Sequence, residues 1–142
     1  MVCEREKNPI NVEITFDLDE KLGDVNLIGE DFSRVVLNLV NNGFDAMREK
    51  SNTDPEYSPV LSIFTKRKGE NVEITVADNG PGIPEDIQDK ILQPFFTTKK
   101  GTEGTGLGLS ITNDIIKAHG GLLDVKTFIS IKYIPAASNR IA

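Results

Sequence analysis

The chain has 142 residues, of which 38% are hydrophobic and 27% are charged, proportions typical of one soluble globular domain and not of a disordered chain. Its formal net charge of −6 argues against a nucleic-acid partner, which requires a basic face, but it leaves room for a nucleotide bound by a few local donors and a metal. Cys3 is the only cysteine, so an internal disulfide is excluded and a reducing, cytoplasmic setting is expected.

The first half of the chain predicts two short strands and one long helix. Apolar and polar residues alternate from Val12 to Phe16, the pattern of a half-buried strand, and Val25 to Ile28 is a second candidate strand. Asp31 is a plausible N-cap for a long helix that runs to about Lys50. Residues 51–59 are rich in turn formers and predict an exposed loop.

The second half of the chain predicts a hairpin, two helices and a final strand. Residues 60–67 and 71–78 are rich in β-branched residues and flank Gly69, which predicts a β-hairpin. Residues 84–92 indicate a short helix that begins at Pro84. Residues 109–121 indicate a longer helix that the pair Gly120–Gly121 ends.

The C-terminal region, residues 122–142, begins with an uninterrupted alternation. Leu122 to Tyr133 contains no glycine and no turn signal, which predicts one long strand. No apolar run approaches the ~20 residues of a membrane span, and the charged N-terminus lacks an apolar signal segment, so we expect no direct membrane contact. Together the elements predict a single domain over residues 1–142, an α/β sandwich with one mixed, mostly antiparallel sheet packed against about three helices.

Three short polar side chains share one stripe of the long helix. Asn38, Asn42 and Asp45 stand at i, i+4 and i+7, within one narrow sector at about 100° per residue. They border the face that must pack on the sheet, which carries Phe32, Val36, Leu39, Ala46 and Met47. The stripe is either an ordinary polar helix edge or a metal and phosphate site, because an asparagine oxygen is a neutral hard ligand that suits Mg²⁺.

An acidic residue ends the second strand of the predicted hairpin. Asp78 is followed by Gly80 and Gly82, which is either a turn or a site for a nucleotide base. A carboxylate accepts hydrogen bonds and does not donate them, so it suits the exocyclic amine of adenine and repels the oxygen of guanine. Glycines would let a flat ring approach the backbone.

A glycine-rich stretch precedes the last predicted helix. Gly104, Gly106 and Gly108 stand directly before it, so their N–H groups and the helix dipole can face an anion, and Lys99 and Lys100 can add positive charge. The alternative interpretation of this stretch, taken alone, is a disordered surface loop.

Together and in this order, these segments resemble the N, G1, F and G2 boxes of the GHKL ATPase superfamily. The four matches are Asn38–Asn42, Asp78-x-Gly80-x-Gly82, Phe95–Phe96 and Gly104-x-Gly106-x-Gly108. Within the superfamily, "PFFTTK…GTGLGLS" and "IIKAHGG" most resemble the catalytic and ATP-binding domain of bacterial sensor histidine kinases, over residues 10–125. The resemblance implies the Bergerat α/β fold, with ATP and Mg²⁺ bound under a mobile lid.

The resemblance also implies individual roles. Asn42 would ligate Mg²⁺, Asn38 would support the phosphate end, and Asp78 would bind the adenine amine. The expected catalytic residues are Asn38 and Lys99. Lys99 stands where the lid of the family could reach the terminal phosphate. The expected nucleotide-binding residues are Asn38, Asn42, Asp45, Asp78, Gly80, Gly82, Ile83, Phe96, Gly104, Thr105, Gly106, Leu107 and Gly108.

The implied activity is that of a protein-histidine kinase in two-component signal transduction. The domain would transfer the γ-phosphoryl group of ATP to a histidine on a separate dimerisation domain, with a response regulator downstream. No segment of this chain matches the histidine-bearing hairpin, and His119 stands at a helix end, where a structural role is expected. The chain is therefore expected to be half of an enzyme, either a fragment or a stand-alone module, and could belong to a larger membrane-bound or soluble sensor protein.

Two other functions within the superfamily stay open. An ATP-gated clamp is disfavoured because clamps carry a glutamate on this helix stripe, where this chain has Asn38. An anti-sigma-type serine kinase shares the fold but matches "PFFTTK" and "HGG" less well. A continuous C-terminal strand would also project beyond a small sheet, which raises the hypothesis of a weak dimer through strand pairing.

Overall fold

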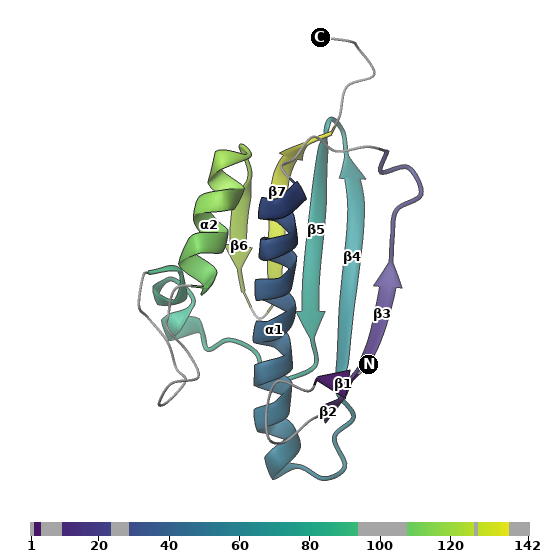
Figure 1. Ribbon diagram of the computed structural model, residues 1–142, viewed down its shortest axis with the longest axis vertical. Coiled ribbons are helices and arrows are strands. Elements are labelled where there is room, and N and C mark those ends of the chain that lie inside the picture. The colour runs from purple at the N-terminus through teal and green to yellow at the C-terminus, as the bar shows by residue number, and fades with distance from the viewer. Residues whose placement is uncertain (1, 4–9, 24–28, 94–107, 127, 137–142) are drawn as a thin grey trace.

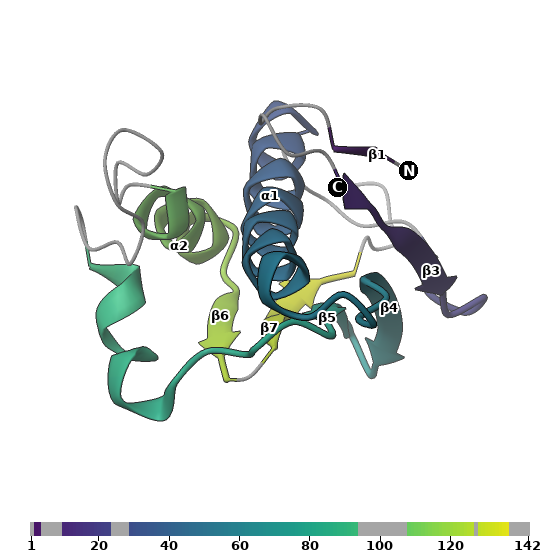
Figure 2. The same ribbon diagram turned by 90° about the horizontal axis from the view of Figure 1, so that it is seen from below.

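The computed structural model describes residues 2–3, 10–23, 29–93, 108–126 and 128–136. The described elements form two layers, with the helices α1 and α2 on one face of a five-stranded sheet (Figures 1 and 2). Their bounds are β1 Val2–Cys3, β2 Ile10–Asn11, β3 Glu13–Asp17, α1 Gly29–Thr53, β4 Val60–Lys68, β5 Asn71–Asp78, η1 Glu85–Ile87, η2 Lys90–Leu92, α2 Gly108–Ala118, β6 Leu122–Val125 and β7 Ile129–Pro135.

The sheet has the strand order β3-β4-β5-β7-β6. β3 pairs with β4 in parallel, and every other pairing in this sheet is antiparallel. The predicted α/β sandwich with a mixed, mostly antiparallel sheet is therefore confirmed. The described residues form two α-helices where about three helices were expected.

The long helix α1 is confirmed, but it begins at Gly29 and ends at Thr53, so Asp31 lies inside its first turn and residues 51–53 are helical. Its sheet-facing side is buried as the pattern predicts: Phe32, Leu39 and Met47 are at most 8% exposed. Val35 and Phe44 are buried with them and widen the apolar face. The helix therefore packs across the sheet through a stripe several side chains wide.

The predicted hairpin is confirmed. β4 and β5 pair from Leu61↔Asp78 to Lys68↔Asn71, and Gly69 turns between them with a positive φ of 64°, a conformation that glycine adopts without strain. Asp78 therefore ends β5 at the end of the sheet opposite this turn (Figure 1). The expected strand at residues 25–28 lies outside the described part of the chain.

The expected helix over residues 84–92 is not continuous. The chain forms two 3₁₀ turns, Glu85–Ile87 and Lys90–Leu92. Ile91 is buried, whereas the acidic and basic residues around it are exposed. With so few apolar positions, the segment has too small a buried face to hold a full α-helix against the domain.

The prediction of one long C-terminal strand is wrong. The chain turns back between β6 and β7, which pair in an antiparallel hairpin with Val125 opposite Ile129. A bulge in β7 then sets two residues, Lys132 and Tyr133, opposite one residue of β5. Tyr133 has a positive φ of 63° at this bulge and is 56% exposed, whereas Ile134 is fully buried. β6 thus forms one edge of the five-stranded sheet. The hypothesis of a dimer through a projecting strand loses its basis.

The second helix ends as predicted. The backbone N–H of Gly121 donates to the carbonyl oxygen of Ile116 (2.9 Å), and Gly120 has a φ of 82°, the left-handed conformation that often ends a helix. His119 lies at this end of the helix: its Nδ1 lies 2.8 Å from the carbonyl oxygen of Ile115, and its ring contacts the ring of Phe32 edge-on.

Among the described residues, no helix has the length and apolarity to cross a membrane.

Candidate functional site

The carboxylate of Asp78 is the most distinctive group at the end of the sheet. Its Oδ1 accepts a hydrogen bond from the backbone N–H of Gly80 (2.8 Å). Burial raises the pKa of the Asp78 carboxyl, although the Gly80 hydrogen bond opposes this change. A partly buried acceptor of this kind suits a donor that a ligand brings, since an added hydrogen bond compensates the loss of water.

Two glycines allow the backbone to come close to this carboxylate. A Cβ atom at Gly80 would lie 2.7 Å from Oδ1 of Asp78 and 3.5 Å from Met47. A Cβ at Gly43 on α1 would lie 3.0 Å from the Leu61 side chain and 3.5 Å from Oδ2 of Asp78. α1 and the end of β5 therefore meet at Asp78 with little space to spare. Gly43 was not among the predicted site residues, although it directly follows Asn42.

Gly82 and Ile83 continue the chain beyond this carboxylate. Gly82 has a φ of 81°, which an L-residue with a side chain seldom adopts. Ile83 is half-buried and packs against the hydrophobic core. The predicted residues Asp78, Gly80, Gly82 and Ile83 thus form one turn that leads away from the end of β5.

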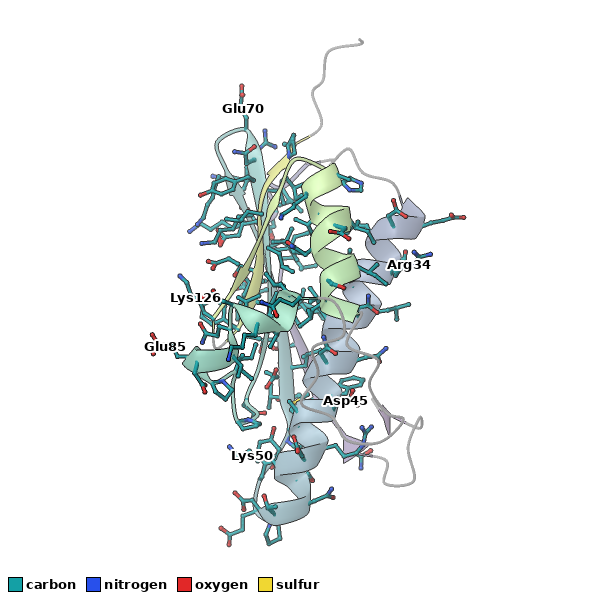
Figure 3. All side chains as sticks on the ribbon, turned by 90° about the vertical axis from the view of Figure 1, so that its left-hand side faces the viewer. Arg34, Asp45, Lys50, Glu70, Glu85 and Lys126 are labelled. Atoms are coloured by element: carbon teal, nitrogen blue, oxygen red, sulfur yellow. The ribbon has the colours of Figure 1, made fainter. Side chains whose placement is uncertain are left out.

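The polar stripe of α1 is present as predicted, but its members have different partners. Nδ2 of Asn38 donates to Oγ1 of Thr112 on α2 (3.2 Å). Asp45 accepts from the guanidinium of Arg48 (2.9 Å), and Arg48 is 8% exposed. Figure 3 shows Asp45 in the middle of α1, between Arg34 and Lys50.

Asn42 links the stripe to the carboxylate. It is half-buried and directly precedes Gly43, the residue that lies beside Oδ2 of Asp78. Asn42 is thus one residue along α1 from the point where the helix meets Asp78. Sequence reasoning missed Thr112 and Arg48, which are buried polar residues; the signal for Thr112 was a polar residue on the apolar face of its helix.

The residues before α2 are described only in part. Gly108 is the first residue of α2. The other expected residues of this region, namely Phe96, Lys99, Gly104, Thr105, Gly106 and Leu107, lie outside the described residues.

The described residues around Asp78 and Asn42 offer single carboxylate and amide oxygens. Within the described ranges, no three His, Cys, Asp or Glu side chains gather closely enough to hold a metal. A neutral amide oxygen, such as that of Asn42, is a ligand for a Mg²⁺ ion whose other ligands are phosphate oxygens and water. The carboxylate of Asp78, beside Gly43 and Gly80, is an acceptor of the kind that an amine on a planar base requires.

Comparison with known proteins identifies close similarities over most of the chain. Residues 28–138 match the family described as "Histidine kinase-, DNA gyrase B-, and HSP90-like ATPase". The sensor histidine kinase ZraS of Escherichia coli (strain K12) is 32% identical over 121 residues, which cover 85% of this chain and 24% of ZraS. The sensory histidine kinase/phosphatase NtrB of Rhizobium leguminosarum bv. phaseoli is 34% identical over 122 residues, which cover 80% of this chain and 31% of NtrB.

Among solved structures, a nucleotide-free form of the catalytic domain of histidine kinase ThkA is similar, with a TM-score of 0.69 and 32% sequence identity. The match covers 88% of this chain and 79% of that chain. The chain spans about a quarter of the length of ZraS and under a third of that of NtrB. The similarity thus concerns one domain of these larger proteins.

Proposed function

Because the chain belongs to the family of histidine kinase-, DNA gyrase B- and HSP90-like ATPases, we propose that it binds Mg-ATP and transfers the γ-phosphoryl group to a histidine of a separate dimerisation domain. Its relatives are sensor histidine kinases, and the chain corresponds to their catalytic domain. The reaction, the metal ion and the partners of the whole protein are the parts that we propose beyond this family membership.

The observation that carries the proposal is the position of Asp78. Its carboxylate stands at the end of β5, holds one backbone N–H, and faces a helix residue that has no side chain. We assign it the exocyclic amine of adenine, since a carboxylate attracts that donor and repels the oxygen that guanine carries at the same place. Gly80, Gly82 and Ile83 would line the same base site.

The polar stripe of α1 supports the phosphate side. Asn42 would provide an amide oxygen to Mg²⁺, and Asn38 would lie beside the phosphates on the α2 side. The metal would neutralise the charge that builds up on the transferred phosphoryl group. Asp45 is held by Arg48, so we assign it a supporting position at the edge of the site. Lys99, Phe96 and residues 104–108 complete the proposed site as the lid.

The partners follow from the reaction. The acceptor would be a histidine on the dimerisation domain of the parent kinase, in cis or in trans, and the phosphoryl group would pass from there to a response regulator. His119 does not fit the acceptor role, because it stands at the end of α2 opposite Gly108, about 15 Å away at 1.5 Å per residue. The site would operate in the cytoplasm, where ATP is supplied.

Labelling with γ-³²P-ATP tests this function. The chain alone should bind ATP, hydrolyse it very slowly and remain unlabelled, because on this proposal the histidine that must be held in line with the γ-phosphorus belongs to the separate dimerisation domain. When the dimerisation domain of the parent kinase is added, that domain should acquire an acid-labile, base-stable label on histidine. Labelling of this chain on His119, or no label on the added domain, would contradict the proposal.

A further inference from the structure

Asn79, the residue after Asp78, joins the end of β5 to the start of β4. Its backbone N–H donates to the carbonyl oxygen of Val60 (3.1 Å), and its Oδ1 accepts the N–H of Val60 (2.8 Å). Its Nδ2 donates to the carbonyl oxygen of Ser58 (2.8 Å). The Asn79 side chain thus continues the hydrogen bonding between the two strands beyond the last residue of β5 and the first residue of β4.

Tyr57 adds a third side-chain bond to this junction. Its hydroxyl donates to Oδ1 of Asn79 (2.9 Å), while its ring packs against the hydrophobic core and lies under the ammonium of Lys50 (4.7 Å). Burial, and then the charge of Asp78, raise the pKa of Tyr57 to about 12. The phenol is protonated near neutral pH, as an ordinary tyrosine is, and its hydroxyl donates to Asn79.

These contacts surround Asp78 with fixed groups on three sides. The peptide that follows it is fixed by Asn79, and its Oδ1 is held by the N–H of Gly80. Its Oδ2 faces Gly43, where a Cβ would come within 3.5 Å. These contacts restrict the orientations that the Asp78 carboxylate can adopt, and a restricted acceptor discriminates better between ligands.

We propose that Asn79 and Tyr57 are positioning residues of the base site: they fix the direction of the Asp78 carboxylate and thereby set the preference for an amine-bearing purine. Neither residue is assigned to the base itself. The inference rests on the proposed role of Asp78 in binding adenine. It extends the site to Ser58 and Val60, in and beside the segment between α1 and β4.

The test compares two nucleotides whose bases differ only at C6 and in the hydrogen that N1 then carries. Calorimetry in EDTA would measure the dissociation constants of ADP and of inosine diphosphate, which carries an oxygen in place of the amine. Tyr57→Phe removes one hydrogen bond and keeps the ring, so ADP should bind about 3-fold more weakly. Asn79→Ala removes all three side-chain bonds, and ADP should bind about 10-fold more weakly. Inosine diphosphate should be affected little.

Asp19 provides the matched control. It clamps the opposite end of the same hairpin, where its carboxylate accepts the N–H groups of Arg67 (2.8 Å) and Lys21 (2.9 Å). Figure 3 shows how far apart these ends are: Glu70 marks the β4–β5 turn at one end of the molecule, and Lys50 lies near the other. Asp19→Ala should lower Tm, as Asn79→Ala should, but should leave the ADP-to-IDP ratio unchanged.

The ratio separates positioning from stability. A reduced preference for ADP in Tyr57→Phe and Asn79→Ala, with a normal preference in Asp19→Ala, is the expected result. If Tyr57→Phe and Asn79→Ala lower Tm but keep the wild-type ratio, the inference is wrong. Should Asn79→Ala fail to fold, Tyr57→Phe alone decides. A wild type that binds both nucleotides equally would contradict the base role of Asp78, and the inference would fail with it.

Discussion

The two ends of the proposed nucleotide site lie on different kinds of secondary structure and are held by different kinds of contact. At the base end, the carboxylate of Asp78 sits at a strand end that backbone and side-chain hydrogen bonds tie to the neighbouring strand. At the phosphate end, Asn38 and Asn42 project from α1, and Asn38 reaches α2 through Thr112. The first end is fixed mainly by the sheet, and the second by side chains between two helices.

On the proposed function, this difference predicts that base choice and metal dependence are separable. A sheet end with paired backbone groups has few conformations to lose when a ligand binds, whereas asparagine side chains on a helix surface lose rotamer freedom. The base end should therefore discriminate between nucleotides with or without Mg²⁺. The phosphate end should add affinity only when both the metal and the phosphates are present.

Replacement of Asp78 should have the largest effect. In Asp78→Asn the amide oxygen can keep the N–H of Gly80, which leaves the amide NH₂ group facing the adenine amine, so ATP binding should weaken by about 2–3 kcal/mol, or roughly 100-fold. Isothermal titration calorimetry with ATP and GTP would measure this. If the variant binds ATP like the wild type, Asp78 does not bind the base, and the proposed difference between the base end and the phosphate end is wrong.

The same variant has an opposite effect on stability. Burial raises the pKa of Asp78 in the folded chain, so the folded state retains a proton that the unfolded state has lost, and the contribution of this group to stability falls as pH rises above about 4. Asp78→Asn should therefore have a Tm that equals or exceeds that of the wild type at pH 7, with a smaller difference near pH 4. Thermal unfolding across this range would check the sign.

Asn42→Ala tests the phosphate end. Loss of the amide oxygen should weaken Mg-ATP binding about 30-fold, equivalent to roughly 2 kcal/mol, and should abolish the gain that Mg²⁺ gives. The preference for ADP over inosine diphosphate in EDTA should remain. If Asn42→Ala binds Mg-ATP normally, the helix stripe is a polar edge without a metal role.

Gly80→Ala returns to the base end with a steric change. A Cβ 2.7 Å from Oδ1 of Asp78 must displace the carboxylate, and the resulting strain should weaken ADP binding about 10-fold. Gly29→Ala is the matched control, since within the described part of the chain its Cβ would meet no heavy atom within 4 Å. Equal affinities for both variants would mean that the carboxylate can move without loss of binding.

Thr112→Val should have the smallest effect on binding. Valine has the same shape but cannot accept the hydrogen bond of Asn38, and Thr112 is fully buried. We expect a stability loss of about 1–2 kcal/mol, seen as a lower Tm, and a reduction of about 3-fold in Mg-ATP affinity. Thr112→Ser should restore both, because it keeps the hydroxyl; failure of this rescue would show that packing, and not the hydrogen bond, is what Thr112 provides.

Much of the fold could be predicted from the sequence because periodicity and glycine position agree. The β4–β5 hairpin has alternation on both sides of Gly69, and α1 has a continuous apolar stripe. The C-terminal hairpin could not be found in this way, since three residues separate Val125 from Ile129. A turn of three residues keeps the alternation in phase, so a hairpin and one long strand present the same pattern.

The sequence suggested candidate site residues only where several motifs follow one another in a family-like order. Asp78, Gly80 and Asn42 became candidates in this way, and their roles stay predictions. The contacts around them could not be found in this way: Tyr57 and Asn79 lie 22 positions apart, and Asn38 and Thr112 lie 74 positions apart. The first contact depends on the exact register of the β4–β5 hairpin, and the second on how α1 and α2 pack side by side, which local patterns do not encode.

The central claim is that the carboxylate at the end of β5 chooses the base independently of the metal. Calorimetric titration of the wild-type chain with ATP and with GTP, each in Mg²⁺ and in EDTA, tests it most directly. The account predicts that ATP binds more tightly than GTP in both conditions and that Mg²⁺ strengthens ATP binding. Equal affinities for ATP and GTP, or a preference that disappears in EDTA, would contradict it.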